Sequence, residues 1–220
     1  NTQGAAENLA LLQGASSDVQ IGFVQGGASQ APDAASSLTS LGSMFYEPVW
    51  LFYRADSAQR LLKKPTLDSL SQLEGWRVNI GAPGSGVPHL AMRLLEANRI
   101  DAQAIALSQQ PVTPAVIELL ESRLDALVLA SAPESAMVQM LLQTPGIALF
   151  DFAQADAYTR RFGFLSAVTL PRGVVDLARD MPAADVRMVA PTATLVVRDD
   201  LHPALAQLFV QAARDVHGDS

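Results

Sequence analysis

A glycine-rich stretch is the part of this sequence whose residue types and spacing could bind or transform a small molecule. It covers residues 77–88 as RVNIGAPGSGVP, and apolar residues follow it at helical spacing. The stretch therefore predicts a strand, a loop and the start of a helix. The first N–H groups of a helix lack partners and carry partial positive charge, and Gly84 and Gly86 would let a ligand approach the backbone. We expect a site for a small anion here, to which Ser85 adds a hydroxyl.

Two nucleotide-binding patterns resemble this stretch without matching it. A phosphate-binding P-loop requires Lys and then Ser or Thr after its last glycine, whereas Val87 and Pro88 follow Gly86. A dinucleotide-binding loop requires a third glycine where His89 stands. A plain tight connection in an α/β fold explains the same spacing as well as an anion site does, because many helix starts bind nothing.

Few residues of this sequence suggest enzyme chemistry. The three histidines, His89, His202 and His217, are scattered, and none has the spacing of a metal-binding pair. Ser85 lacks the Gly-x-Ser-x-Gly context of a hydrolase nucleophile, and the chain has no cysteine. The sequence therefore predicts no catalytic residue, no metal and no cofactor.

Charge and composition restrict the partners that we expect. The chain has 220 residues, of which 49% are hydrophobic and 17% charged, so it can form a substantial core. Its net charge is −7, which argues against nucleic acid or an anionic membrane surface as a partner. No apolar run approaches the roughly 18 residues that a membrane-spanning helix needs. The chain opens at Asn1 without an initiator methionine or signal peptide, so we expect a piece of a longer protein.

Strands and helices alternate along the chain, which predicts an α/β fold with mostly parallel sheets. A polar stretch at 29–40 precedes an aromatic segment at 44–54, and this suggests passage from one domain into another; Pro48 favours an edge strand or one entered late. We expect further strands at 18–25, 78–80, 104–107, 125–131, 147–152, 164–170, 186–189 and 192–197. We expect helices at 4–13, 68–73, 89–98, 114–124, 133–142, 153–161 and 203–216.

Five motifs follow one another along the chain: GAAENL at 4–9, IGFVQ at 21–25, Tyr46-Glu47-Pro48, GSGV at 84–87 and Asp125-Ala126. Taken in this order, they resemble the TAXI family of TRAP-transporter solute receptors, which are type 2 periplasmic binding proteins. Two departures stand out. Family members start with one more strand and helix, and they usually have Thr where Val87 stands.

The resemblance implies two α/β lobes, each a mostly parallel sheet flanked by helices, with a cleft between them. Lobe one would hold residues 1–44 and 164–220, and lobe two residues 45–163. The cleft would take a small carboxylate or an amino acid such as glutamate, and closure would present it to the membrane permease subunits of a transporter. The protein would then be periplasmic or otherwise extracytoplasmic, and segments outside this sequence could anchor it to the membrane.

We expect ligand contacts at strand ends and helix starts that would face the cleft. Gly4 and Ala5 precede a helix, and Gln25 ends a strand with a side chain that both donates and accepts hydrogen bonds. The full set of candidate residues is Gly4, Ala5, Gln25, Tyr46, Ser85, Gly86, Val87, Ser131 and Tyr158. Arg54 and Arg172 are held in reserve as side chains that could neutralise an anion.

Two other functions stay open on the sequence alone. A LysR-type transcription regulator uses the same two-lobed fold as its ligand-sensing effector domain. An enzyme of this fold could use Tyr46 or Glu47 as an acid or base.

Overall fold

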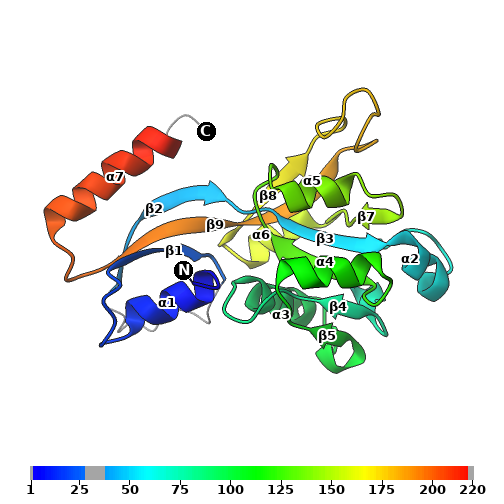
Figure 1. Cartoon of the computed structure of the whole chain (residues 1–220), viewed down its shortest axis with the longest axis horizontal. Helices are drawn as coiled ribbons and strands as arrows, with labels where there is room; N and C mark the ends of the chain where they lie inside the picture. The colour runs from blue at the N-terminus through cyan, green and yellow to red at the C-terminus, as the bar shows by residue number, and fades with distance from the viewer. Residues whose placement is uncertain (1, 28–37, 218–220) are drawn as a thin grey trace.

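The computed structural model describes residues 2–27 and 38–217, and it places two β-sheets side by side with helices packed around them (Figure 1). The expected α/β architecture of two sheets flanked by helices is confirmed. In the described residues, no helix is long and apolar enough to cross a membrane.

The first sheet is organised around one long strand, β9 (Val186–Arg198). Strands β1 (Ile21–Gln25) and β2 (Leu38–Tyr46) flank its C-terminal half, and β8 (Leu165–Leu170) pairs with its N-terminal half. All three pairings are antiparallel, so the expectation of a mostly parallel sheet is wrong here. For β8 and β9 the reason is that no helix lies between them, and a direct return of the chain makes neighbouring strands antiparallel.

The second sheet has the strand order β5-β4-β6-β3-β7 and is mixed. Strand β4 is parallel to β5 and β6, whereas β3 is antiparallel to β6 and β7, so the sheet is parallel only in part. The strands are β3 (Val49–Arg54), β4 (Arg77–Asn79), β5 (Ala106–Ser108), β6 (Ala126–Ala130) and β7 (Ile147–Leu149). The helices around it are α2 (Ala55–Leu62), η1 (Leu70–Leu73), α3 (Val87–Ala97), η2 (Ala102–Ala104), α4 (Val112–Leu120), α5 (Ala136–Leu142) and α6 (Ala155–Arg161).

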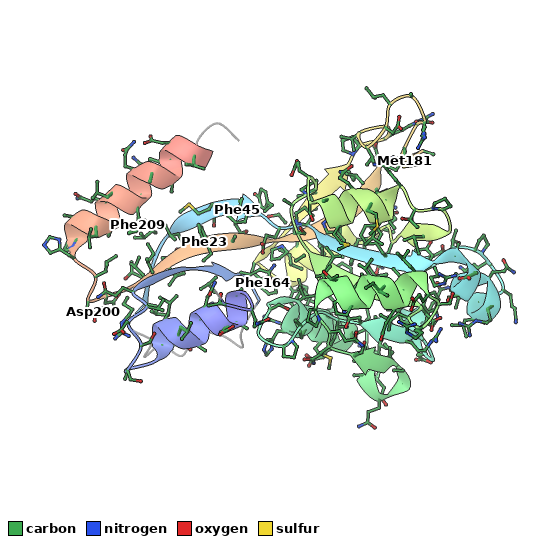
Figure 2. The ribbon with its side chains drawn as sticks, in the orientation of Figure 1. Phe23, Phe45, Phe164, Met181, Asp200 and Phe209 are labelled. Carbon is green, nitrogen blue, oxygen red and sulfur yellow. The ribbon has the colours of Figure 1, made fainter. Side chains whose placement is uncertain are left out.

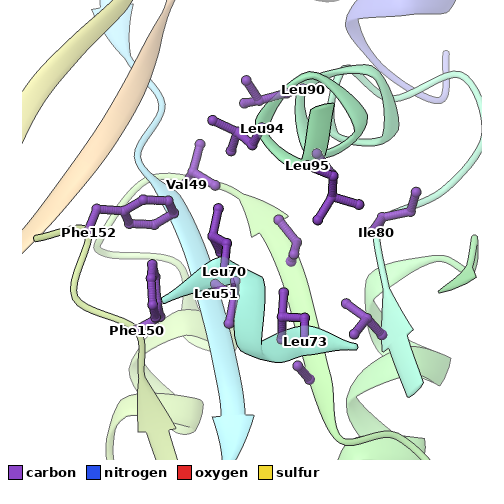
Figure 3. Packing of buried hydrophobic residues seen from close by; sticks show 14 of the residues in the cluster. Val49, Leu51, Leu70, Leu73, Ile80, Leu90, Leu94, Leu95, Phe150 and Phe152 are labelled. Atoms are coloured by element: carbon purple, nitrogen blue, oxygen red, sulfur yellow. The ribbon is translucent and has the colours of Figure 1, made fainter. Parts of the chain in front are cut away.

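Strand β3 is covered on both of its faces. Val49 and Leu51 belong to one buried cluster, and Trp50 and Phe52 belong to a second cluster on the opposite face. Figure 3 shows Val49 and Leu51 among leucines of α3 and the ring of Phe152. Of the two alternatives that Pro48 suggested, the edge strand is therefore wrong, because β3 lies between β6 and β7. The strand entered late is confirmed, because β3 begins at Val49 and Pro48 takes no part in its ladder of hydrogen bonds.

Two chain segments run between the two halves of the molecule (Figure 1). The first is the junction of β2 and β3, where Glu47 N donates to Pro191 O at 3.0 Å. The second is β9 itself, which the sequence predicted as two strands separated at Pro191. The strand continues because Pro191 lies where its pairing partners change from β8 to β1 and β2.

The ends of β8 pack with the cores of the second sheet, since Leu165 belongs to one cluster and Leu170 to the other. The predicted lobe boundaries, 1–44 with 164–220 and 45–163, stay a prediction. Beside β8, the ring of Phe164 lies where the two halves of the molecule meet (Figure 2). A Cβ added at Gly27, which follows β1, would come within 2.5 Å of that ring, and the Arg93 guanidinium lies 4.8 Å from its centre.

Two helices accompany the first sheet. Helix α1 (Ala5–Gln13) packs on β1, and α7 (Pro203–His217) stands beyond β2 (Figure 1). The predicted short strand at 104–107 begins later, at Ala106, because η2 occupies the residues before it.

Asp125, in the predicted Asp-Ala motif, has a structural role behind the second sheet. Its buried carboxylate accepts hydrogen bonds from Ser57 Oγ at 2.6 Å, from Arg60 Nη2 at 2.8 Å and from Arg77 Nε at 2.9 Å. Burial raises the pKa of Asp125, but the bonds from Arg77 and Ser57 outweigh that effect and lower it to about 2. The charged network joins the starts of β4 and β6 to α2.

Candidate functional site

A cavity of about 510 Å³ lies between the first sheet and the loops of the second sheet. One side of its wall comes from the start of α1 and from β1, β2 and β9, and the other from β6 and the loops that precede α3 and α4. The volume falls in the range of about 300–1,000 Å³ that is usual for small-molecule sites.

The N-terminal ends of three helices contribute to the cavity wall. They are represented by Gly4 and Ala5 of α1, Gly86 and Val87 of α3, and Val112 of α4. None of these three ends has a side-chain cap. Glu7 N of α1 already donates to Gly84 O, and Pro88 and Pro114 have no N–H, so each helix start offers a ligand only its remaining first-turn N–H groups. Each end also carries partial positive charge, which favours an anion in the cavity.

The start of α1 touches the glycine-rich loop directly. Glu7 N donates to Gly84 O at 3.1 Å, and a Cβ added at Gly4 would lie 3.1 Å from Ser85 Cα. Gly4 has φ 139° and Gly84 has φ 85°, backbone conformations that favour glycine. The glycines therefore allow the two halves of the molecule to approach each other at the cavity.

The serine hydroxyl of this loop is already engaged. Ser85 Oγ donates to Ala82 O at 2.8 Å, so its lone pairs remain available as acceptors. An anion at this loop would thus rely first on the backbone N–H groups.

A polar pair, a buried glutamine and a half-buried glutamate, lies on the first-sheet side of the cavity. Gln25 Nε2 donates to Glu47 Oε2 at 2.7 Å, and both residues line the wall. Burial raises the pKa of the Glu47 carboxyl above its ordinary value, and the hydrogen bond from Gln25 opposes that rise. Glu47 is the only residue with an ionisable side chain among the described residues of the wall.

Two aromatic rings complete this side of the wall. The ring centres of Phe23 and Phe45 lie 5.7 Å apart at an interplanar angle of 53°. The side chains remain partly open, with 44% and 36% of each residue exposed. They offer apolar surface to the carbon skeleton of a ligand.

Six of the nine predicted site residues line the cavity. These are Gly4, Ala5, Gln25, Ser85, Gly86 and Val87. Whether they bind a ligand stays a prediction, but the structure brings all six to one space.

The other three predicted residues lie outside the cavity wall. Tyr46 is 55% exposed, because alternate residues of a strand face opposite sides and its neighbours Phe45 and Glu47 face the cavity. Ser131 lies past β6, and its carbonyl accepts from Trp50 Nε1 at 2.9 Å. Tyr158 is buried, and its hydroxyl accepts from Asn98 Nδ2 at 2.7 Å, so it packs and pairs within the second half.

The two reserve arginines are also remote from the cavity. Arg54 Nη1 donates to Leu119 O at 3.0 Å, at the end of α4, and Arg172 Nε donates to Asp180 at 2.6 Å. No Lys or Arg is among the described residues of the wall. Any negative charge on a ligand would therefore meet backbone N–H groups rather than a cationic side chain.

Sequence reasoning missed Phe23, Phe45 and Glu47 as residues of the ligand site. A signal was present, because Phe23 and Gln25 are two residues apart in one strand and so share a face. Glu47 appeared only as a possible enzymatic acid or base. Across residues 2–27 and 38–217, no group of three or more His, Cys, Asp or Glu side chains is placed to hold a metal ion.

Comparison with known proteins gives both a family and a fold. The NMT1-like family matches residues 1–215. No curated protein matches the sequence.

Three solved structures illustrate the similarity of fold. The periplasmic aliphatic sulphonate-binding protein SsuA from Escherichia coli has TM-score 0.56 and 12% identity, over 99% of this chain and 59% of that one. The regulatory domain of CcmR from Synechocystis, solved with 2-PG, has TM-score 0.55 and 11% identity, over 97% of this chain and 80% of that one. AbpA, an amino acid ABC transporter substrate-binding protein from Streptococcus pneumoniae bound to L-arginine, has TM-score 0.52 and 14% identity, over 98% and 69%. The two-lobed fold of type 2 periplasmic binding proteins is therefore confirmed.

Proposed function

The chain belongs to the NMT1-like family, and from this premise we propose that it is the solute-binding component of a TRAP-type transport system. It captures a small carboxylate or an amino acid such as glutamate in the cavity between its lobes, without chemistry, metal or cofactor. The motifs that resemble TAXI receptors support the TRAP assignment. Its partners are then the membrane permease subunits, not nucleic acid, and its location is periplasmic.

The observation that carries this proposal is the convergence of three uncapped helix starts on one cavity that no Lys or Arg lines among the described residues. Helix starts bind carboxylates through backbone N–H groups and partial charge, as the resemblance to carboxylate receptors requires. Because α1 belongs to the first sheet and α3 and α4 to the second, a ligand held by all three would draw the lobes together. Closure of this kind is the usual response of two-lobed receptors.

A second candidate is a ligand-sensing regulatory domain, such as that of a LysR-type regulator. The fold of the CcmR regulatory domain favours it, since that domain is as similar to this chain as the transport proteins are. The two functions share the same ligand chemistry. They differ in the partner, so binding of the loaded protein to reconstituted permease subunits would support transport.

The anion site is tested by placing a negative charge in it. Gly86 has a right-handed backbone conformation with φ −73°, so Gly86→Asp puts a carboxylate at the start of α3 without backbone strain. Favourable charge at a helix start contributes roughly 0.3–1 kcal/mol, and about 2 kcal/mol when partly buried. Repulsion and lost space add to this, so affinity for a carboxylate should fall about tenfold or more.

The measurement is calorimetric titration with the ligand that native mass spectrometry finds on the purified protein, or with L-glutamate. Gly163→Asp is the matched control, because Gly163 is exposed and a Cβ there meets nothing within 4 Å. Thermal stability of the Gly86 variant should change little, since Asp is well accepted near helix starts. Normal binding by Gly86→Asp would show that the glycine-rich loop is only a turn.

A further inference from the structure

Gln25 and Glu47 are held together by the pairing of the first sheet. Strands β1 and β2 flank β9, and both Gln25 and Phe45 are in register with Ala193. Ala193 also lines the cavity. The pair therefore occupies a fixed position on the wall.

The hydrogen bond between these residues fixes which atoms remain for a ligand. The amide nitrogen of Gln25 donates to Glu47 Oε2, so the amide oxygen of Gln25 and the second carboxylate oxygen of Glu47 remain as acceptors. Gln25 is only 5% exposed, and within the described residues no hydrogen bond reaches its amide oxygen. Two neighbouring acceptors on the wall of a cavity can both accept from one donor group of a ligand, and a positively charged donor makes the stronger hydrogen bonds.

The charge of the wall leads to the same requirement. Glu47 makes no ion pair with a described residue, although it is half-buried. Burial raises the pKa of its carboxyl, which indicates that the surrounding residues compensate its negative charge poorly. A ligand that brought an ammonium group to this carboxylate would supply the missing charge.

We propose that Gln25 and Glu47 receive the ammonium group of a zwitterionic ligand, while the helix starts of α1, α3 and α4 receive its carboxylate. This inference rests on the proposed function and narrows its ligands to amine-bearing carboxylates. Plain mono- and dicarboxylates lack the donor that this part of the wall requires. The Phe23 and Phe45 rings border the same part of the wall and pack against the carbon skeleton.

The test compares probes that differ only in the amino group. Calorimetric titrations use L-glutamate beside glutarate, L-glutamine beside glutaramic acid, and L-arginine beside 5-guanidinopentanoic acid. The native protein should bind one of the amino acids at least about tenfold more tightly than the matched probe that lacks the α-amino group, because a hydrogen bond to a charged group contributes roughly 1.5–3 kcal/mol.

Substitution of the acceptor should remove this preference. In Glu47→Gln the carboxylate becomes an amide of similar size, so the affinity ratio within a pair should fall towards one. Glu74→Gln is the matched control, since Glu74 is exposed and lies outside the cavity. Circular dichroism and thermal melting establish that both variants are folded, and retained binding of glutarate by Glu47→Gln would show an intact cavity.

The pH dependence supplies an independent measurement. An ammonium group needs the ionised carboxylate, so amino acid affinity should rise as the pH increases through the pKa of Glu47. If the protonated carboxyl instead donated to the ligand, affinity would fall over the same range, and the inference would be wrong.

The outcomes separate this inference from the proposed function. Equal binding of both members of a pair by the native protein leaves the carboxylate receptor standing and overturns the ammonium site. Failure of every probe to bind would contradict both.

Discussion

Gly4→Ala would test whether contact between α1 and the glycine-rich loop is part of the ligand-bound form. Gly4 has φ 139° and ψ −159°, a region that is essentially restricted to glycine. An added Cβ would lie 3.1 Å from Ser85 Cα and 3.4 Å from Ser85 Cβ. The first contact is tighter than ordinary van der Waals contact and involves backbone, so the neighbour must move by a few tenths of an ångström.

The substitution has two effects of different origin. Strain at the backbone acts in every folded form and should lower the free energy of unfolding by about 1–3 kcal/mol. The contact with Ser85 acts only when the two halves of the molecule approach each other. The free-energy cost of overpacking by one methyl group is at the low end of the usual range, about 1 kcal/mol, which corresponds to about a fivefold loss of affinity.

A second glycine separates these effects. Gly75 also has a positive φ, 78°, but a Cβ there meets nothing within 4 Å. Urea unfolding should therefore show lower stability for both Gly4→Ala and Gly75→Ala, whereas calorimetric titration with L-glutamate should show weaker binding for Gly4→Ala alone. If Gly4→Ala binds like the native protein, the contact between α1 and the loop is not required in the bound form, and the reasoning fails.

Two further predictions concern the frame of the site. The folded protein lowers the pKa of Asp125 from 3.8 to about 2, so the ionised carboxylate stabilises the fold above pH 3.8 and this stabilisation is lost as the pH falls towards about 2. Urea unfolding should show a loss of about 2 kcal/mol in the free energy of unfolding over this window, and Asp125→Asn should not show it. Gly27→Ala should lower the free energy of unfolding more in the native protein than in the Phe164→Ala variant, because the added Cβ would lie 2.5 Å from the ring of Phe164. If a double-mutant cycle gave additive effects of the two substitutions, this contact would be refuted.

The glycine-rich stretch could be predicted because local rules determine its structure. Glycines at positive φ interrupt the chain, and Pro88 suits the first turn of the helix that begins at Val87. The same is true of α1 after Gly4. Each element depends on residues close to it in sequence, and both were placed within a residue or two.

Strand pairing could not be predicted in the same way, because it depends on residues far apart in the chain. Pro191 suggested a break between two strands, yet β9 runs through it. A proline lacks the N–H of a ladder hydrogen bond, but Pro191 stands where the partners of β9 change. The first sheet is built around this one strand, since β1, β2 and β8 all pair with it.

The ligand site shows the same division between local and distant information. Period-two alternation places Phe45 and Glu47 on one face of their segment and Tyr46 on the other, but it does not say which face meets the cavity. That choice depends on β1, where Gln25 reaches Glu47 across β9. A glutamate beside a site for a simple anion would weaken binding by repulsion. Together with the helix starts, however, Glu47 matches a zwitterion, because it faces the positive ammonium group while the helix starts face the negative carboxylate. The acidic residue therefore indicates which kind of ligand the cavity accepts.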